Sequence, residues 1–183
     1  MSTYMDILAI TGSTRKNSYN TALLRAVSHY SSDQSTVSLF DSIDQIPLFD
    51  PEVEDAFIPQ EVQHLISRLR EADAVIISSP EYAHGMTGAV KNLLDWLVAS
   101  DALVLKPVMV CSVSTSGLGG VRAYYSLTQT LVAMNTHVVI DSSLLVPYAN
   151  SKFDDQLKLI DPITIKSIDL SLLTLERVIK NRQ

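Results

Sequence analysis

The stretch Met5-Asp-Ile-Leu-Ala-Ile-Thr-Gly-Ser-Thr-Arg-Lys-Asn-Ser-Tyr-Asn20 determines how the rest of the chain is interpreted. Its first part, Ile7 to Ile10, is a short apolar run without alternation. Such a run is typical of a strand buried on both faces, although alone it does not exclude a helix. Gly12 then permits a sharp turn, and a helix is predicted from about Asn20 because apolar residues recur on one face. The stretch therefore predicts the strand–turn–helix unit of an α/β fold.

The turn between this strand and this helix has the chemistry of an anion site. It offers short polar side chains and two cations, namely Ser13, Thr14, Arg15, Lys16, Ser18 and Asn20. The first N–H groups of a helix lack internal partners, and the helix dipole adds positive charge there, so a phosphate is a natural occupant. The alternative is an ordinary βα turn capped by Ser18 or Asn20. With Gly12 as its one glycine, the turn lacks the patterns of triphosphate and dinucleotide loops, which favours a single phosphate.

Composition limits the class of protein. A chain of 183 residues is a natural size for one domain, 1–183, and its 46% hydrophobic residues allow a substantial core. The net charge of −6 argues against a nucleic-acid surface or an anionic membrane as partner. We find no apolar stretch long enough to span a bilayer and no basic segment followed by an apolar one at the N-terminus. A soluble cytoplasmic protein is expected.

Cysteine and histidine give little indication of a metal site or a nucleophile. Cys111 is the single cysteine, so an internal disulfide is impossible. Its apolar neighbours predict a buried, unreactive thiol, because a nucleophilic thiolate needs an exposed, electropositive setting. His29, His64 and His137 are scattered without the spacing of metal ligands, so no metal is expected.

Strand and helix patterns alternate along the whole chain. After the first unit, strands are predicted at 36–40, 74–77, 107–113 and 137–146, helices at 60–71, 88–98, 122–134 and 162–181, and a long loop at 41–58. Alternating strands and helices imply a five-stranded parallel sheet with helices on both faces. The common doubly wound order for five strands is 2-1-3-4-5, and ligands then bind beyond the carboxyl ends of strands 1 and 3. The small-residue loops 12–20, 80–85 and 112–120 converge on that edge.

Together these loops carry several motifs. They are Gly12-Ser-Thr-Arg-Lys-x-Ser-x-Asn20, Pro80-Glu-Tyr82, Gly88-Ala-Val-Lys-Asn-Leu-Leu-Asp-Trp96 and Gly119-Gly-Val-Arg122, with support from Ile46-Pro-Leu-Phe-Asp50 and Lys106-Pro-Val108. In this combination the chain resembles the NAD(P)H-dependent FMN reductases of flavodoxin-like fold, a family that includes chromate, quinone and azo reductases. The resemblance covers roughly residues 5 to 135. It implies a flavodoxin-like three-layer α/β sandwich.

The resemblance also implies a set of FMN-binding residues. The phosphate would be held by Ser13, Thr14, Arg15, Ser18 and Asn20; the isoalloxazine would lie along Pro80, Glu81, Tyr82, Ala83 and His84; and its other side would border Ser112, Ser114 and Gly119. Ala83 stands where many relatives have Asn, and Thr87 stands where many have Pro. His84 is either a contact of this kind or an ordinary surface histidine.

The implied activity is that of an oxidoreductase in which FMN itself carries the electrons, so no catalytic side chain is needed. Electrons from NADPH or NADH would pass by a ping-pong cycle to flavins, quinones, azo compounds or similar small acceptors. Two alternatives are an electron carrier of the flavodoxin type without its own substrate and a binding module that has lost flavin. The resemblance favours a homodimer or homotetramer, in which Trp96 and its neighbours form either core or a dimer face.

Overall fold

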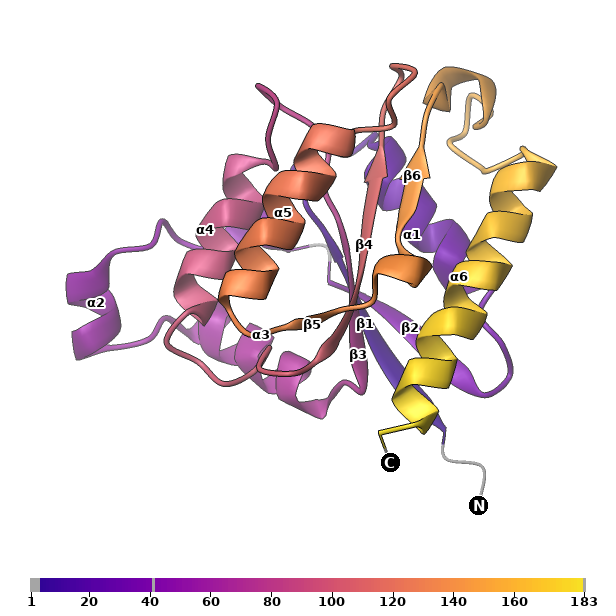
Figure 1. Cartoon of the computed structure of the whole chain (residues 1–183). Helices are drawn as coiled ribbons and strands as arrows, with labels where there is room; N and C mark the ends of the chain where they lie inside the picture. Colours follow the sequence, from indigo (N-terminus) through magenta and orange to yellow (C-terminus); the bar gives the residue numbers. More distant parts are fainter. Residues whose placement is uncertain (1–3, 41, 183) are drawn as a thin grey trace.

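The computed structural model of the protein describes residues 4–40 and 42–182, which form a parallel sheet with helices on both faces (Figure 1). The strands are β1 (Met5–Thr11), β2 (Ser35–Phe40), β3 (Ala74–Ser78), β4 (Pro107–Val113), β5 (His137–Val138) and β6 (Leu144–Val146). Their hydrogen-bonded order is β2-β1-β3-β4-β5, and β6 also pairs with β4. This order confirms the predicted doubly wound, flavodoxin-like arrangement.

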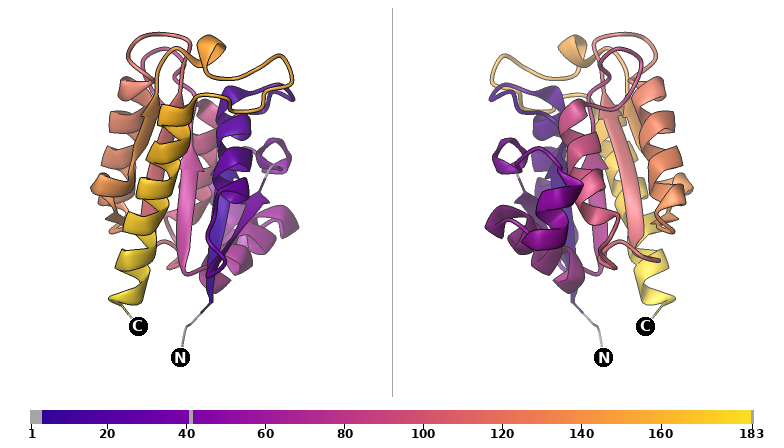
Figure 2. Two further views of the ribbon diagram at one scale, coloured as in Figure 1. Left: turned by 90° about the vertical axis from the view of Figure 1, so that its right-hand side faces the viewer. Right: turned by 90° about the vertical axis from the view of Figure 1, so that its left-hand side faces the viewer.

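The helices divide between the two faces of the sheet (Figures 1 and 2). The longer ones are α1 (Tyr19–His29), α3 (Gln60–Glu71), α4 (Gly88–Leu97), α5 (Val121–Ala133) and α6 (Pro162–Lys180). One hydrophobic cluster packs α1 and α6 against the sheet, and a second packs α3, α4 and α5 against it. Every residue of β3 and β4 is buried, because side chains on both faces meet a helix layer.

The segment 137–146, which was predicted to hold a fifth strand, contains two short strands. β5 pairs with Pro107 and Val108 at the start of β4, whereas β6 pairs with Cys111 to Val113 at its end. Between them the chain forms a short 3-10 helix, η2 (Ile140–Ser142). The polar run Asp141-Ser142-Ser143 explains the interruption: Ser142 Oγ donates to Val139 O over 2.8 Å and closes a local turn, which competes with the strand ladder. The sheet therefore has a sixth strand in addition to the five predicted.

The predicted loop 41–58 contains local structure as well. It holds a 3-10 helix, η1 (Ile43–Gln45), and a short helix, α2 (Pro51–Ala56), which projects from the body in Figure 1. Asp50 caps α2 by accepting a hydrogen bond from Glu52 N over 2.9 Å, and Pro51 occupies the first helical position, where its missing N–H costs nothing. Residue 41, where the predicted loop begins, lies outside the described residues.

Trp96 belongs to the core. Its residue is 2% exposed, its indole Nε1–H donates to Pro47 O over 2.8 Å, and Phe49 meets its ring edge-on. These contacts bind the segment before α2 to α4. Of the two roles left open by the sequence, core or dimer face, the structure selects core.

The loops that leave the carboxyl ends of β1, β3 and β4 gather at one end of the molecule, and the start of β1 and the end of α6 lie near the opposite end (Figure 1). Among the described residues, no helix is long and apolar enough to cross a membrane. The functional loops thus share one rim, as predicted from the strand order.

Candidate functional site

The first loop begins with a close approach of the backbone at Gly12. Its N–H donates to Ser78 O over 2.7 Å, and its carbonyl accepts from Thr87 Oγ1 over 2.7 Å. A Cβ at position 12 would lie 2.5 Å from Val90 Cγ2 and 3.0 Å from Ser78 O, so only glycine fits. Thr87 Oγ1 also accepts from Val90 N as the N-cap of α4. The start of the first loop is therefore fixed to the second.

Beyond Gly12 the loop presents hydrogen-bond donors at the start of α1. Ser18 occupies the N-cap position, but its hydroxyl makes no capping bond. Within the described part of the chain, the N–H groups of Tyr19, Asn20 and Thr21 have no acceptor. Ser13 and Ser18 are buried beside this helix end, whereas Arg15 is exposed. The arrangement has the unpaired donors and the dipole of an anion site.

Asn20 has an internal role. Its residue is 3% exposed, and its amide Nδ2 donates to Val113 O over 3.1 Å. Its Oδ1 accepts from Val113 N over 3.0 Å and from Ser78 Oγ over 2.9 Å. The side chain thus connects α1 to the ends of β3 and β4 and keeps at most one amide hydrogen for a ligand. Its assignment as a phosphate contact stays a prediction.

The second loop is a tight hairpin turn at the rim. Tyr82 and Gly85 exchange two backbone hydrogen bonds, of 3.1 and 3.0 Å. The two residues between them, Ala83 and His84, have φ angles of 48° and 63°. Positive φ at both central positions defines a type I′ turn, which normally contains Asn and Gly because other residues are strained there. Tyr82 is half-exposed beside this turn, and the tip of the loop is open to solvent.

Glu81 ties the second loop to α5. Its carboxylate accepts from Arg122 N over 3.0 Å and from the Arg122 guanidinium over 3.3 Å. Burial opposes ionisation of Glu81, but the hydrogen bonds from Arg122 and from Ala123 N outweigh it, so the pKa of Glu81 lies below its ordinary value. A carboxylate at a helix start also complements the dipole. Glu81 is therefore an ionised cap, and its negative charge lies at the site's edge.

The third loop packs against the second through buried serine and glycine residues. Ser112 Oγ donates to Ser79 O over 2.7 Å. Gly119 and Gly120 have φ angles of 60° and 81°, and a Cβ at position 120 would overlap Ser112 Oγ. Ser114 Oγ lies 3.0 Å from Ser116 Oγ at the exposed side of this loop. The backbone of loop three consequently runs close to the end of β4 and to Glu81 of loop two.

Some residues at the rim were missed by the sequence reasoning. Tyr148 has a φ of 53°, which is unusual for an aromatic residue, and its hydroxyl lies 2.6 Å from where a Cβ of Gly117 would stand. Thr21, Arg25 and Asp44 line a polar cavity of about 270 Å³ next to the first loop. The positive φ of Tyr148 is a conformational feature that no local sequence pattern revealed. The position of Thr21, Arg25 and Asp44 around one cavity depends on which side of α1 faces β2, and only the fold determines that.

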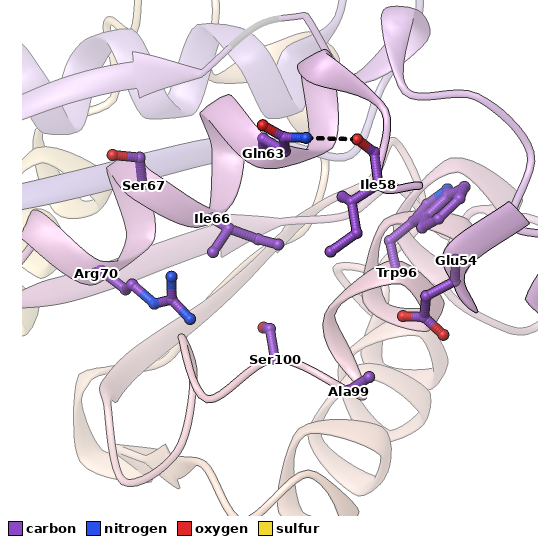
Figure 3. A pocket seen from close by; sticks show the side chains of 9 residues that line it. All are labelled: Glu54, Ile58, Gln63, Ile66, Ser67, Arg70, Trp96, Ala99 and Ser100. Atoms are coloured by element: carbon purple, nitrogen blue, oxygen red, sulfur yellow. Dashed lines mark hydrogen bonds between the residues drawn. The ribbon is translucent and has the colours of Figure 1, made fainter. Parts of the chain in front are cut away.

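A different cavity, of about 680 Å³, lies between α3, the end of α4 and α2 (Figure 3). Its lining includes Ile66, Trp96 and Arg70, and Gln63 Nε2 donates to Ile58 O at its edge over 2.7 Å. It contains none of the predicted FMN-binding residues. Its volume alone does not make it the flavin site.

Other chemistries have little support in the structure. Cys111 is fully buried, which confirms the predicted buried thiol, and desolvation raises the pKa of that thiol to about 12. The described residues contain no group of three or more His, Cys, Asp or Glu side chains that could hold a metal ion.

The rim fits FMN on its own geometry. The unpaired N–H groups of α1 and the buried hydroxyls of Ser13 and Ser18 suit one phosphate. The tight turn at Tyr82 and the glycine pair at 119–120 bring backbone without bulky side chains to the same rim. FMN, when bound, would supply the redox chemistry that these side chains lack.

Comparison with known proteins also indicates an FMN-dependent reductase. A sequence model described as NADPH-dependent FMN reductase matches residues 5–151. The chain is 32% identical over 178 residues to an NAD(P)H-dependent FMN reductase of Pseudomonas aeruginosa, covering 96% of each chain. It is 33% identical over 160 residues to a quinone reductase of Escherichia coli, covering 85% of each.

Among solved structures, the flavoenzyme NAD(P)H:(acceptor) oxidoreductase FerB from Paracoccus denitrificans superposes with a TM-score of 0.83 at 21% identity, covering 94% of this chain and 98% of that one. That likeness supports the fold. The family match and the two relatives confirm the resemblance read from the three loops. The chain therefore belongs to the NADPH-dependent FMN reductase family, whose members are oxidoreductases that use FMN as flavin and NAD(P)H as electron donor.

Proposed function

We propose that this protein takes electrons from NADPH or NADH and delivers them, by way of bound FMN, to small acceptors such as flavins, quinones or azo compounds. The observation that carries the proposal is the start of α1, where the N–H groups of Tyr19, Asn20 and Thr21 are unpaired within the described chain next to buried Ser13 and Ser18. Such donors favour one terminal phosphate. FMN has that phosphate and riboflavin does not.

Each rim loop has its own proposed task. The FMN phosphate is assigned to the first loop; this assignment covers Ser13, Thr14, Arg15, Ser18 and Asn20. The turn from Pro80 to His84 borders one side of the isoalloxazine, and Ser112, Ser114 and Gly119 border the other. The hydrogen bonds from Ser112 to Ser79 O and from Arg122 N to Glu81 tie the second loop to the end of β4 and to the start of α5. The chain thus orients the cofactor, and FMN when bound provides hydride and electron transfer.

The choice of acceptor rests on the openness of the rim and on the relatives. Tyr82 is 52% exposed, so the proposed isoalloxazine site beside it is accessible to a planar molecule. One relative is named as a quinone reductase, and another as a subunit of an NADH:(hydroxy)cinnamate reductase of Vibrio ruber. A single open face also supports a ping-pong cycle, in which the nicotinamide leaves before the acceptor enters the same space.

Stopped-flow absorbance tests this function directly. The FMN-loaded protein is mixed with NADPH or NADH without acceptor, and the flavin absorbance band is followed; a quinone is then added in a second mixing step. We expect rapid bleaching, rapid recovery with quinone and, in steady state, parallel double-reciprocal lines. Absence of bleaching with both donors would assign the protein to the electron carriers, and intersecting lines would exclude the ping-pong cycle.

We further propose that the protein assembles as a homodimer or homotetramer. The family resemblance supports this, and α6 exposes apolar side chains on its outer side at Ile163, Leu170 and Leu173. Sedimentation velocity measures the assembly, and a monomer at micromolar concentration would contradict it.

A further inference from the structure

A cavity of about 330 Å³ lies between α1 and the segment 156–159, which belongs to the connection from β6 to α6. Ala22 and Ala26, one helical turn apart, line it from α1, and Leu159 lines it from the facing segment. All three residues are buried, and the short side chains of the two alanines leave the space open. Ligand pockets usually enclose about 300 to 1,000 Å³, so the cavity can hold a small molecule.

The wall of the cavity opposite α1 is fixed by a closed turn. Asp154 Oδ1 accepts from Gln156 N over 2.9 Å and from Lys158 N over 2.8 Å, and Asp154 N donates to Lys158 O over 3.0 Å. Leu157, which lies within this turn, has a φ of 60°, a left-handed conformation that residues other than glycine rarely adopt. Its half-buried side chain packs against the hydrophobic cluster of α1 and α6. Such conformations persist where the surroundings fix them, and they occur often at ligand sites.

The lining of the cavity contains cations but no carboxylate. Arg25, His29 and Lys158 line it, whereas no aspartate or glutamate does, in a chain with 20 acidic and 14 basic residues. Within the part of the chain that the structure describes, none of the three forms an ion pair. Of the two acidic residues in the turn, Asp154 accepts from backbone N–H groups and Asp155 is exposed to solvent. Cations beside an apolar surface suit a ligand with an apolar body and an anionic group.

This cavity does not include the residues proposed to bind FMN. None of them lines it, and it shares only Arg25 with the polar cavity beside the first loop. From Ala22 it extends along α1 to His29 and Tyr30 at the end of the helix, away from the N–H groups at the helix start. The rings of His29 and Tyr30 meet edge to face, with centroids 4.9 Å apart. Aromatic walls favour an aromatic ligand.

We propose that this cavity binds a small aromatic carboxylate at a site separate from that of FMN. The carboxylate pairs with Arg25 and Lys158, and the ring lies against the two alanines of α1 and against Leu157. Arg25 lies in the middle of α1, away from the partial negative charge that the helix dipole places at its end, so the anionic group is assigned to this part of the helix. The paired N–H groups of a guanidinium also match the two oxygens of a carboxylate.

Calorimetry with 2-naphthoate and its neutral analogue 2-naphthamide tests both the charge and the shape of the site. The FMN-loaded wild type is expected to bind 2-naphthoate about tenfold more tightly than 2-naphthamide. Lys158→Gln should weaken 2-naphthoate binding about three- to fivefold, the scale of one partly exposed ion pair, and leave 2-naphthamide binding unchanged. Lys166→Gln, on the exposed side of α6, is the matched control and should change neither affinity. Equal affinity for the two compounds, no binding of 2-naphthoate, or an unchanged affinity in Lys158→Gln would overturn the proposal.

Two further measurements locate the bound compound. Ala26→Leu places a larger side chain in the cavity and should weaken both compounds at least about tenfold; if this variant does not fold, Leu157→Ala removes the opposite wall and should weaken both about threefold. Full affinity in a folded variant of this kind would contradict the assignment. The apoprotein should bind 2-naphthoate as tightly as the FMN-loaded protein does. Displacement of 2-naphthoate by FMN would show that the compound occupies the flavin site instead.

Discussion

Replacing Asn20 by alanine separates two roles that the first loop could assign to this residue, clamp or phosphate contact. The structure predicts that the clamp is its main role, with at most one amide hydrogen left for the phosphate. The substitution removes the bonds from Nδ2 to Val113 O (3.1 Å), from Val113 N to Oδ1 (3.0 Å) and from Ser78 Oγ to Oδ1 (2.9 Å). Each neutral hydrogen bond contributes about 1 kcal/mol net, and a buried group left unpaired costs about 1–3 kcal/mol.

The expected loss for Asn20→Ala is therefore about 3–5 kcal/mol of unfolding free energy, allowing for some rotation of the Ser78 hydroxyl. This is a large share of the stability of an ordinary domain. Urea unfolding of the apoprotein, followed by circular dichroism, measures it as a shift of the midpoint at constant slope. Ser18→Ala is the matched control, because the Ser18 hydroxyl makes no capping bond in the structure.

Ser18→Ala should change the unfolding free energy by less than about 1 kcal/mol and weaken FMN binding by about 1 kcal/mol, the net value of one hydrogen bond. Fluorescence quenching of FMN measures that affinity in both variants. The reasoning would be refuted if Asn20→Ala lost less than about 1 kcal/mol of stability while FMN affinity fell more than about tenfold. In that case Asn20 would be a ligand contact whose internal bonds are dispensable.

Three further predictions concern the second loop and the core. Ala83→Asn should raise the unfolding free energy by about 0.5–1 kcal/mol in urea titrations, since Asn tolerates the positive φ that strains Ala83; a decrease would contradict the strain argument. Because the folded pKa of Glu81 is lowered, its contribution to stability is complete above its unfolded pKa and is lost as pH falls through the folded pKa. Glu81→Gln should therefore reduce the fall in unfolding free energy that the wild type shows as the pH is lowered. An unchanged fall would exclude the role of Glu81 as an ionised cap of α5. Cys111, with a pKa of about 12, should resist a thiol reagent at mildly alkaline pH and react once urea unfolds the protein.

The sequence predicted the centre of the fold better than its edges, for a physical reason. β3 and β4 are buried on both faces, and their sequences are short apolar runs. Such runs between two predicted helices are typical of central strands of a parallel sheet. The edge segment after α5 has only one neighbouring strand, and there the serines at 142 and 143 are free to close a local turn. α2 was missed because its length is below what apolar periodicity detects, although Asp50-Pro51 is a sound helix-start signal.

For the site, the sequence identified the loops but left the side-chain roles open. Hydroxyl and amide groups near a helix start serve equally as ligand contacts and as internal clamps, and composition does not distinguish the two. Asn20 forms three internal hydrogen bonds across the rim, whereas the Ser18 hydroxyl makes no capping bond. Arg25 was overlooked because its position near the first loop depends on how α1 packs against β2. That packing includes the hydrogen bond from Ser28 Oγ to Val37 O, nine residues apart in sequence.

The hydrogen bonds at the rim explain how loops of small residues can hold a planar cofactor. Thr87 fixes Gly12, Asn20 fixes Val113, Ser112 fixes the Ser79 carbonyl, and Glu81 fixes Arg122. Every one of these bonds joins a different pair of segments. Protein groups thus supply this part of the ordering of the loops, and the free energy of cofactor binding is not needed for it. Among the described rim residues, the N–H donors at the start of α1 and the cations beside them have no protein partner, and there an anionic ligand gains the most.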